Sequence, residues 1–255
     1  MTATLQLIRH ATLAISYGGT VFLLDPMLDE AGHRPPIAGS ANDRRNPLVE
    51  LPFPLAELPR PDALLVTHLH ADHWDETAAR SLDPDIPVFT QPGAGAALRQ
   101  AGFRQVGEVE ASVRIGRVTV RRTGGRHGTG DIGERMGAVS GFILTTEGEP
   151  SLYIAGDTIW CEEVKEAIDR YAPEWIVANA GGARFAEGDP ITMDEEDIIR
   201  LAEYAPDSRI IAVHMDSINH CLVTRGALRA ALRSRGLSER VLLPADGESV
   251  TLGLS

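Results

Sequence analysis

The stretch THLHADHWDE, residues 67–76, places three of the chain's eight histidines within six positions, with an aspartate between the second and the third. It overlaps the end of ALLVT (63–67), an apolar run of strand length, and leads into a predicted helix over 75–82. A tight turn at a strand end can direct several side chains into one small volume. The ligand-type residues of this turn are His68, His70, Asp72 and His73. Imidazole and carboxylate groups at this density indicate a divalent-metal site, and four such groups favour two ions over one.

This H-x-H-x-D-H pattern after a strand resembles the metallo-β-lactamase-fold hydrolase superfamily. Further elements expected of that family follow in order along nearly the whole chain. His127, in GGRHGTG, matches the third histidine of the first metal site. Asp157, in AGDT, matches the carboxylate that bridges the two metals, and His214, after IIAV, matches the last histidine of the second site. Taken singly, each of these three would more often be an ordinary turn or surface residue.

The resemblance implies a ligand set and a reaction. The first metal would be held by His68, His70 and His127, the second by Asp72, His73 and His214, and Asp157 would bridge them. The implied protein is a dinuclear metal-dependent hydrolase, in which a metal-bridging hydroxide attacks a small-molecule ester, lactone or phosphoester. Asp72 also counts among the expected catalytic residues. Zinc is the expected metal, with manganese and iron as alternatives.

Two segments are similar to one branch of the superfamily, which contains relatives of ascorbate-6-phosphate lactonase and N-acylphosphatidylethanolamine phospholipase D. They are IRHATLAISYGGTVFLLDP (8–26) and AVHMDSINHC (212–221). The branch includes lactone, phosphodiester and amide chemistry, so neither it nor the fold determines a substrate. Two alternatives are a non-catalytic metal-binding or sensing module and a nucleic-acid-processing hydrolase. The complete ligand set argues against the first, and the acidic net charge argues against the second.

Several residues near the predicted ligands are candidates for supporting roles. His220 is expected either to bind substrate or protonate its leaving group, or to hydrogen-bond within its own loop. His10 is expected to support the site structurally, at a position where relatives carry a Gly-His-Ala-like element and this chain has Arg9 in place of the glycine. The carboxylates of Asp25 and Asp216 are candidates to accept the free ring N–H of a ligating histidine, although each is equally plausible as a turn or cap residue.

Short apolar runs alternate with stretches of helical periodicity, which favours an α/β layered domain. The resemblance makes this a four-layer αββα sandwich over residues 1–255. A hairpin is predicted around Gly18-Gly19, and later strands or β-rich stretches are predicted over 63–67, 86–90, 113–123, 137–157, 175–179, 209–213 and 241–243. Helices are predicted over 75–82, 92–101, 161–171 and 224–235. The tetrapeptide TMDE (192–195) has the form of a capping box and predicts the start of another helix.

A Pro-rich loop over about 27–61 interrupts this pattern. Eight prolines lie at positions 26, 35, 36, 47, 52, 54, 59 and 61, and neither strand nor helix periodicity is visible between them. Loops of this length inside a compact domain are uncommon and tend to be lids or binding loops. A disordered insert is the alternative that the sequence leaves open.

The bulk composition limits the classes of partner. A net charge of −12 over 255 residues disfavours nucleic acid and anionic membrane surfaces, which require an extended basic face. No apolar run approaches the roughly 20 residues that span a bilayer, and the start lacks the basic segment of a signal peptide. Two cysteines, Cys161 and Cys221, provide no disulfide framework and are expected to be packing residues. A cytoplasmic enzyme is expected, with its oligomeric state left open.

Six arginines near the predicted mouth of the site suggest an anionic small-molecule substrate. They are Arg44, Arg45, Arg121, Arg122, Arg126 and Arg184. Guanidinium groups bind carboxylates and phosphates in a bidentate manner, which makes this hypothesis physically reasonable. Exposed arginines without a specific partner are common, and that is the alternative.

Overall fold

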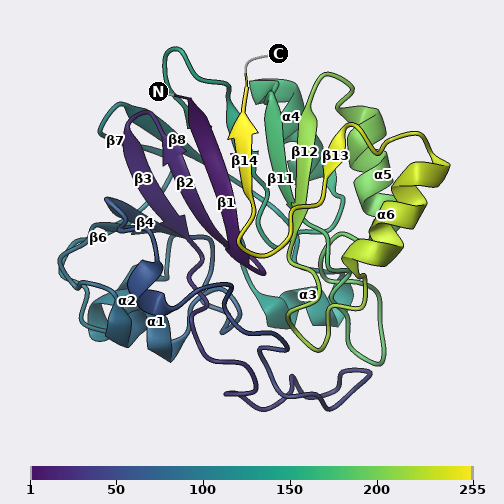
Figure 1. The fold of residues 1–255 in the computed structure, drawn as a ribbon, viewed down its shortest axis with the longest axis horizontal. Coiled ribbons are helices and arrows are strands. Elements are labelled where there is room, and N and C mark those ends of the chain that lie inside the picture. Colours follow the sequence, from purple (N-terminus) through teal and green to yellow (C-terminus); the bar gives the residue numbers. More distant parts are fainter. Residues whose placement is uncertain (1, 254–255) are drawn as a thin grey trace.

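The computed structural model describes residues 2–253 as two seven-stranded β-sheets with helices on their outer faces (Figure 1). The first sheet has the order β14-β1-β2-β3-β4-β5-β6, and the second has the order β13-β12-β11-β10-β9-β8-β7. The first sheet contains β1 (Ala3–Arg9), β2 (Thr12–Tyr17), β3 (Thr20–Leu24), β4 (Ala63–Val66), β5 (Val88–Thr90), β6 (Val106–Glu108) and β14 (Ser249–Leu252). The second contains β7 (Ser112–Ile115), β8 (Val118–Thr123), β9 (Gly141–Thr145), β10 (Leu152–Ile154), β11 (Trp175–Asn179), β12 (Arg209–Val213) and β13 (Val241–Leu242).

Each sheet is antiparallel at one end and parallel at the other. Strands β14, β1, β2 and β3 pair antiparallel, and β3 to β6 pair parallel. Similarly, β7 to β10 pair antiparallel, and β10 to β13 pair parallel. Five helices connect successive parallel strands, namely α1 (Glu76–Ser81), α2 (Gly95–Gln100), α4 (Glu162–Tyr171), α5 (Glu195–Tyr204) and α6 (Arg225–Ser234). Helix α3 (Gly130–Met136) connects the antiparallel strands β8 and β9, and the parallel strands β3 and β4 are joined by the Pro-rich loop.

Side-chain alternation along the strands produces three stacked cores. In β4, Leu65 faces the other sheet, whereas Leu64 and Val66 face the layer of α1 and α2. In β11, Trp175 packs between the sheets, whereas Ile176 packs against the outer helices. This period of two is the geometry of strands buried on both faces. The described chain is therefore a four-layer αββα sandwich, and the predicted fold class is confirmed.

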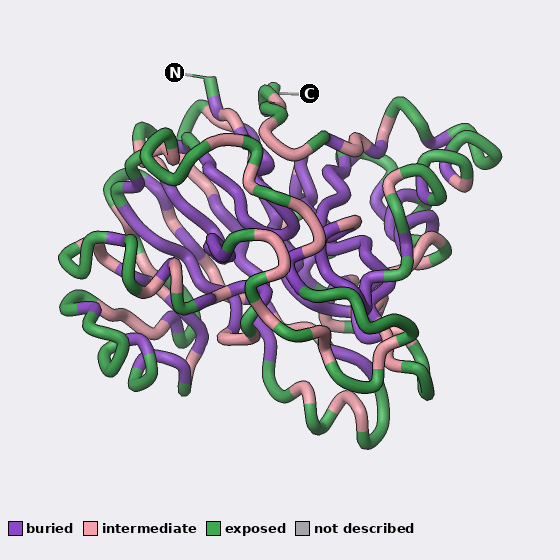
Figure 2. The backbone as a smooth tube through the Cα atoms, turned by 60° about the horizontal axis from the view of Figure 1, so that its bottom comes forward, coloured by how far each residue is buried: buried purple, intermediate pink, exposed green. Residues whose placement is uncertain are grey.

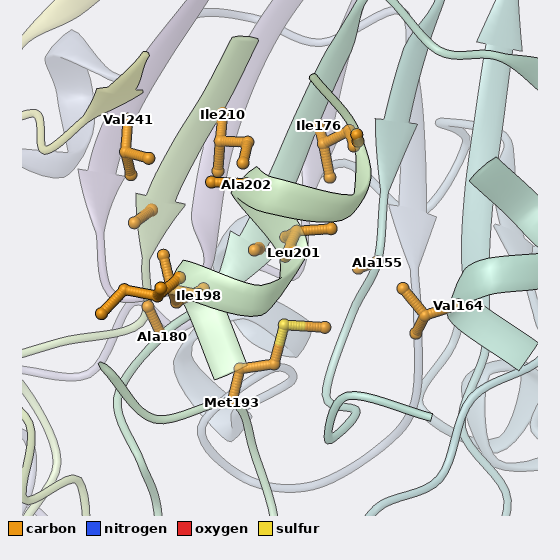
Figure 3. Close-up of a cluster of buried hydrophobic side chains, with 14 of the residues drawn as sticks. Ala155, Val164, Ile176, Ala180, Met193, Ile198, Leu201, Ala202, Ile210 and Val241 are labelled. Atoms are coloured by element: carbon orange, nitrogen blue, oxygen red, sulfur yellow. The ribbon is translucent and has the colours of Figure 1, made fainter. Parts of the chain in front are cut away.

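The core beneath α5 shows how one helix covers its sheet (Figure 3). Ile198, Leu201 and Ala202 recur at helical spacing on α5 and pack against Ile176 and Ile210 of the neighbouring strands (Figure 3). Figure 2 shows the same separation over the whole molecule, with buried strands at the centre and exposed residues along the loops and outer helix turns. No helix within residues 2–253 combines the length and apolarity that crossing a membrane requires.

The structure corrects several details of the sequence prediction. The helix predicted from the capping-box pattern begins after Asp194, whose side chain accepts from the N–H groups of Glu196 and Asp197. The Thr192 hydroxyl instead accepts from Ala183 N at 2.9 Å. The chain also continues past the strand predicted at 241–243 into β14, which pairs with β1. The short elements β6 and α3 were not predicted.

The Pro-rich loop is held against the domain by hydrogen bonds. Its one short helix is a 3₁₀ turn, Leu55–Glu57. The buried guanidinium of Arg9 donates to the carbonyls of Met27 and Asp29 at 2.8 Å and of Val49 at 3.0 Å. These contacts favour the binding-loop alternative over the disordered insert.

Candidate metal centre

The seven predicted ligands all follow strand ends along one edge of the two sheets. The turn after β4 carries His68, His70, Asp72 and His73; the loops after β8, β10 and β12 carry His127, Asp157 and His214, respectively. Asp157 is positioned where its own backbone segment approaches that of Ser140. Gly156, directly before Asp157, has φ +71°, and a Cβ atom at Gly156 would lie 2.7 Å from Ser140 O, so this position requires glycine. The two sheets therefore bring together side chains that are up to 146 positions apart, as His68 and His214 show.

Donor atoms of these residues form two groups that Asp157 joins. In the first group, His70 Nδ1 lies 3.0 Å from His68 Nε2 and 3.3 Å from His127 Nε2. In the second, His214 Nε2 lies 3.2 Å from His73 Nε2 and 3.6 Å from Asp72 Oδ2. Within each group the donor atoms are within 4.8 Å of one another.

The Asp157 carboxylate contacts both groups. Its Oδ2 lies 3.5 Å from His127 Nε2 and 3.2 Å from His73 Nε2, and its Oδ1 lies 3.2 Å from His214 Nε2. Asn179, at the end of β11, donates from Nδ2 to Oδ1 at 2.6 Å. This is the bridging position that the sequence resemblance implies, although its role as a ligand stays a prediction.

The donor set fits divalent cations on electrostatic grounds. Asp72 and Asp157 are buried, and neither forms an ion pair with a lysine or an arginine among residues 2–253. Burial raises the pKa of the Asp157 carboxyl, but His214 and His73 more than offset this and hold it well below its ordinary value. Burial lowers the pKa of His73, but Asp157, Asp25 and Asp72 more than offset this and raise it well above its ordinary value, so this imidazolium supplies positive charge to the buried carboxylates when no cation is bound. A histidine that binds a metal must be neutral. Bound cations would provide the missing charge, so the residues present fit a metal centre.

An outer set of hydrogen bonds orients the histidine rings. The Nδ1 atoms of four rings each face an acceptor: Asp25 Oδ2 for His73 at 2.8 Å, Ile191 O for His127 at 2.8 Å, Thr67 Oγ1 for His68 at 3.0 Å, and Cys221 Sγ for His214 at 3.5 Å. With Nδ1 engaged, each of these rings presents Nε2 to the centre. Asp25 therefore has the supporting role considered for it. Asp216 does not, because its carboxylate pairs with Arg225 at 3.0 Å.

His10 is more closely integrated than the sequence predicted. Its Nε2 lies 3.2 Å from Asp72 Oδ2, and its ring centroid lies 3.6 Å from that of His214. Its carbonyl accepts from His214 N at 2.9 Å. His10 and His214 both have positive φ, 60° and 68°, as does Asp25 at 42°. Non-glycine residues in this conformation are uncommon and cluster at functional sites.

A cavity of about 350 Å³ opens over the two donor groups. Its polar wall contains His70, Asp72, His127, Asp157 and His220, with Arg34 and Asn46 contributed by the Pro-rich loop. The remaining wall is apolar and contains Pro35, Ile37, Ala71, Met136, Phe185, Ile191 and Ile218. Burial lowers the pKa of His220 to about 4, so its imidazole is neutral at neutral pH.

Asparagines close to the cavity were missed by sequence reasoning. The buried Asn219 accepts at Oδ1 from Ile37 N at 3.0 Å and from Asn46 Nδ2 at 2.8 Å, and its own Nδ2 donates to Asn42 O at 2.9 Å. It thereby attaches the Pro-rich loop to the segment that carries His220. A loop asparagine has no distinctive sequence signal. Asn179 did have one, because a polar residue at the carboxyl end of a buried strand faces the same edge as the predicted ligands.

The six arginines considered for anion binding lie elsewhere; the lining residues of the cavity include none of them. Arg126 pairs with Glu163 at 2.9 Å, and Arg45 donates to Gly32 O at 2.7 Å. The arginine that does line the cavity is Arg34, whose Nε lies 2.9 Å from Asp29 Oδ2. The hypothesis of an anionic substrate gains no support from these residues and stays a prediction.

Comparisons with known proteins agree with this geometry. Residues 20–215 match the model of the beta-lactamase superfamily domain. The UPF0173 protein YddR of Bacillus subtilis is 36% identical over 96% of this chain and 98% of its own length. The crystal structure of an isothiocyanate hydrolase from Delia radicum gut bacteria has a TM-score of 0.93 and 38% identity, covering 97% of this chain and 98% of that one. A possible metal-dependent hydrolase from Veillonella parvula has a TM-score of 0.96 and 34% identity, covering 99% and 100%.

Proposed function

Because the chain belongs to the beta-lactamase superfamily and is a UPF0173 metal-dependent hydrolase, we propose that it hydrolyses a small organic molecule at an electrophilic carbon atom. Two divalent ions, with zinc as the first candidate, would be held by His68, His70 and His127 and by Asp72, His73 and His214, with Asp157 between them. When bound, such ions acidify a water molecule and polarise the bond that it attacks.

One observation carries this proposal: the two donor groups and the Asp157 carboxylate that joins them lie at the base of a cavity large enough for a small molecule. A metal site with a purely structural role is normally closed by protein ligands. Here four members of the donor set, His70, Asp72, His127 and Asp157, line the open space. The arrangement therefore supports chemistry on a bound molecule.

Residues of the chain position the reacting groups. Asn179 and His10 hold the carboxylates of Asp157 and Asp72 through hydrogen bonds of 2.6 and 3.2 Å. His220 lines the cavity, and within residues 2–253 its Nε2 has no hydrogen-bond partner, whereas its Nδ1 lies 3.9 Å from Cys221 Sγ. We assign to this neutral ring a hydrogen bond to the substrate, and to Asp72 the transfer of a proton from water to the leaving group.

The first substrate class to test is an isothiocyanate, because the solved hydrolase of that name is 38% identical over 97% of this chain. In that reaction, R–N=C=S and one water molecule give the amine R–NH₂ and carbonyl sulfide. The water oxygen bonds to carbon, the carbon–nitrogen bond breaks, and both water protons end on nitrogen. Esters and lactones undergo the same kind of attack at carbon and form the second class. The predicted relation to the lactonase and phospholipase branch stays a prediction; the lactone in the panel and an added phosphodiester test it.

The test combines metal analysis with a substrate panel. We expect purified protein to contain one to two equivalents of a transition metal and to hydrolyse an isothiocyanate, an ester or a lactone. His70→Ala and Asp157→Ala should abolish turnover, whereas Arg44→Gln, which changes an exposed loop residue, should leave it unchanged. Protein with far less than one equivalent of metal, or turnover that survives both ligand substitutions, would contradict the proposal.

A further inference from the structure

The apolar wall of the cavity is built from five separate parts of the chain. Ile191 and Ile218 belong to a buried cluster with Met27, and they contribute the most buried part of the wall. Ile37, Met136 and Phe185 are packed against that cluster only in part, and they also line the cavity. Their remaining apolar surface is therefore available to a ligand.

This wall is fixed in place before any ligand arrives. Ala186 N donates to Gly39 O at 2.6 Å, which attaches the segment of Phe185 to the tip of the Pro-rich loop. The same loop is held by Asn219, which accepts from Ile37 N. A preformed apolar surface gains binding free energy from a ligand without the cost of ordering a loop.

Charge is absent from the apolar wall but present at the metal donors. Arg34 is the one lysine or arginine among the cavity-lining residues; its Nε lies 2.9 Å from Asp29 Oδ2, and its buried Nη2 has no hydrogen-bond partner within residues 2–253. A charged group placed against the side chains of Ile37, Met136 and Phe185 would lose its hydration without gaining a partner from them. The reactive group of a substrate lies at the metal donors, so this restriction applies to the remainder of the molecule.

We infer that the substrate is uncharged and largely hydrocarbon outside its reactive group, and that Ile37, Met136 and Phe185 select it by the apolar surface they present. The inference rests on the proposed function only in placing the reactive group at the metal donors. Selection by the wall is an equilibrium property, so it is measured without turnover. The expected consequence is that the Kd of a ligand decreases as its hydrocarbon chain becomes longer.

The experiment titrates the metal-loaded protein with straight-chain primary amides of three to seven carbon atoms by isothermal titration calorimetry. We expect Kd to decrease about fourfold for each added methylene until the wall is covered. A second series carries a carboxylate at the chain end distant from the amide. These compounds should bind at least tenfold more weakly than the amides of equal length.

Phe185→Ala should weaken binding of the longest amide by roughly tenfold or more and leave the shortest amide nearly unchanged. Phe53→Ala is the matched control, since Phe53 lines a different groove. Ile37→Asn is a second variant at a half-buried position, so it keeps the test valid if Phe185→Ala is unstable.

A Kd that is independent of chain length, no binding of any amide, or tighter binding of the carboxylated series would overturn the inference. Equal effects of Phe53→Ala and Phe185→Ala would also overturn it. If the amides bind as expected while no panel substrate is hydrolysed, the proposed function fails and the inference stands. If a panel substrate is hydrolysed while the Kd of the amides does not depend on chain length, the proposed function stands and the inference fails.

Discussion

The His73 ring donates from Nδ1 to Asp25 Oδ2 at 2.8 Å, although the two residues are 48 positions apart in the sequence. The same carboxylate accepts from the backbone N–H of Thr67 at 2.7 Å and from its hydroxyl at 2.6 Å. One buried aspartate therefore connects the end of β3 to the end of β4 and to the turn of metal donors. It fixes the His73 ring with Nε2 toward Asp157.

Asp25→Asn should weaken metal binding by about 10- to 100-fold, because an amide accepts less strongly from the histidine N–H and makes His73 a poorer ligand. The measurement is metal affinity by competition with a coloured chelator. Asp216→Asn is the matched control, since that aspartate pairs with Arg225 and not with a histidine. Equal metal affinities for the Asp25 variant and the unmodified protein would contradict the assigned role.

His214 and His220 should respond differently to alanine substitution. His214→Ala removes a donor atom of the second group and should lower the metal content by about one equivalent. His220→Ala should keep both metals but reduce kcat/KM by about tenfold or more, because a cavity hydrogen-bond donor is lost. Metal analysis and steady-state kinetics on both variants separate the two roles. Loss of metal from the His220 variant would make it a ligand instead.

Asn219→Ala should loosen the Pro-rich loop over the cavity. The substitution leaves Ile37 N and Asn46 Nδ2 without their shared acceptor, and it costs about 1–3 kcal/mol of unfolding free energy. Because Ile37 belongs to the apolar wall, KM should rise more than kcat falls. Urea unfolding and kinetics check both effects. A variant with normal KM and normal stability would show that the loop is held by its other contacts.

The sequence carries a local signal for the donors of the turn at 68–73, whereas His127, Asp157 and His214 were expected from the family resemblance, since each alone is an ordinary turn or surface residue. His68, His70 and Asp157 are ligand-type residues next to apolar strands, and strand ends of two packed sheets meet at one edge. The contributions of Asn219 and Arg34 depend on loop partners that no local pattern identifies.

The helix cap and the strand pairing that the sequence did not predict also depend on contacts between residues far apart in the chain. Thr192 and Asp194 both suit a helix cap, and the choice of Asp194 follows from Thr192 being engaged with Ala183. The pairing of β14 with β1 joins residues some 250 positions apart, such as Ala3 and Leu252, which sequence periodicity cannot connect.

Arg9 is fully buried in β1, where the sequence alone gives no partner for its charge. Its pKa is lowered to about 10, mainly by burial, so the guanidinium stays charged at neutral pH. The charge is accommodated by carbonyls of Met27 and Asp29 at the start of the Pro-rich loop and of Val49 in its later part.

Arg9→Met should therefore leave these carbonyls without their donor and reduce the free energy of unfolding by roughly 2–4 kcal/mol. Arg9→Lys should recover only part of this loss, because one ammonium group cannot reproduce the planar fork that serves three acceptors. Arg229→Met, at an exposed position on α6, is the control and should change stability by less than about 0.5 kcal/mol. Urea unfolding provides the comparison. Equal stabilities of the Arg9 and Arg229 variants would mean that the Pro-rich loop does not depend on Arg9. Steady-state kinetics on Arg9→Met add a second readout, because an unchanged KM would mean that the cavity does not depend on Arg9 either.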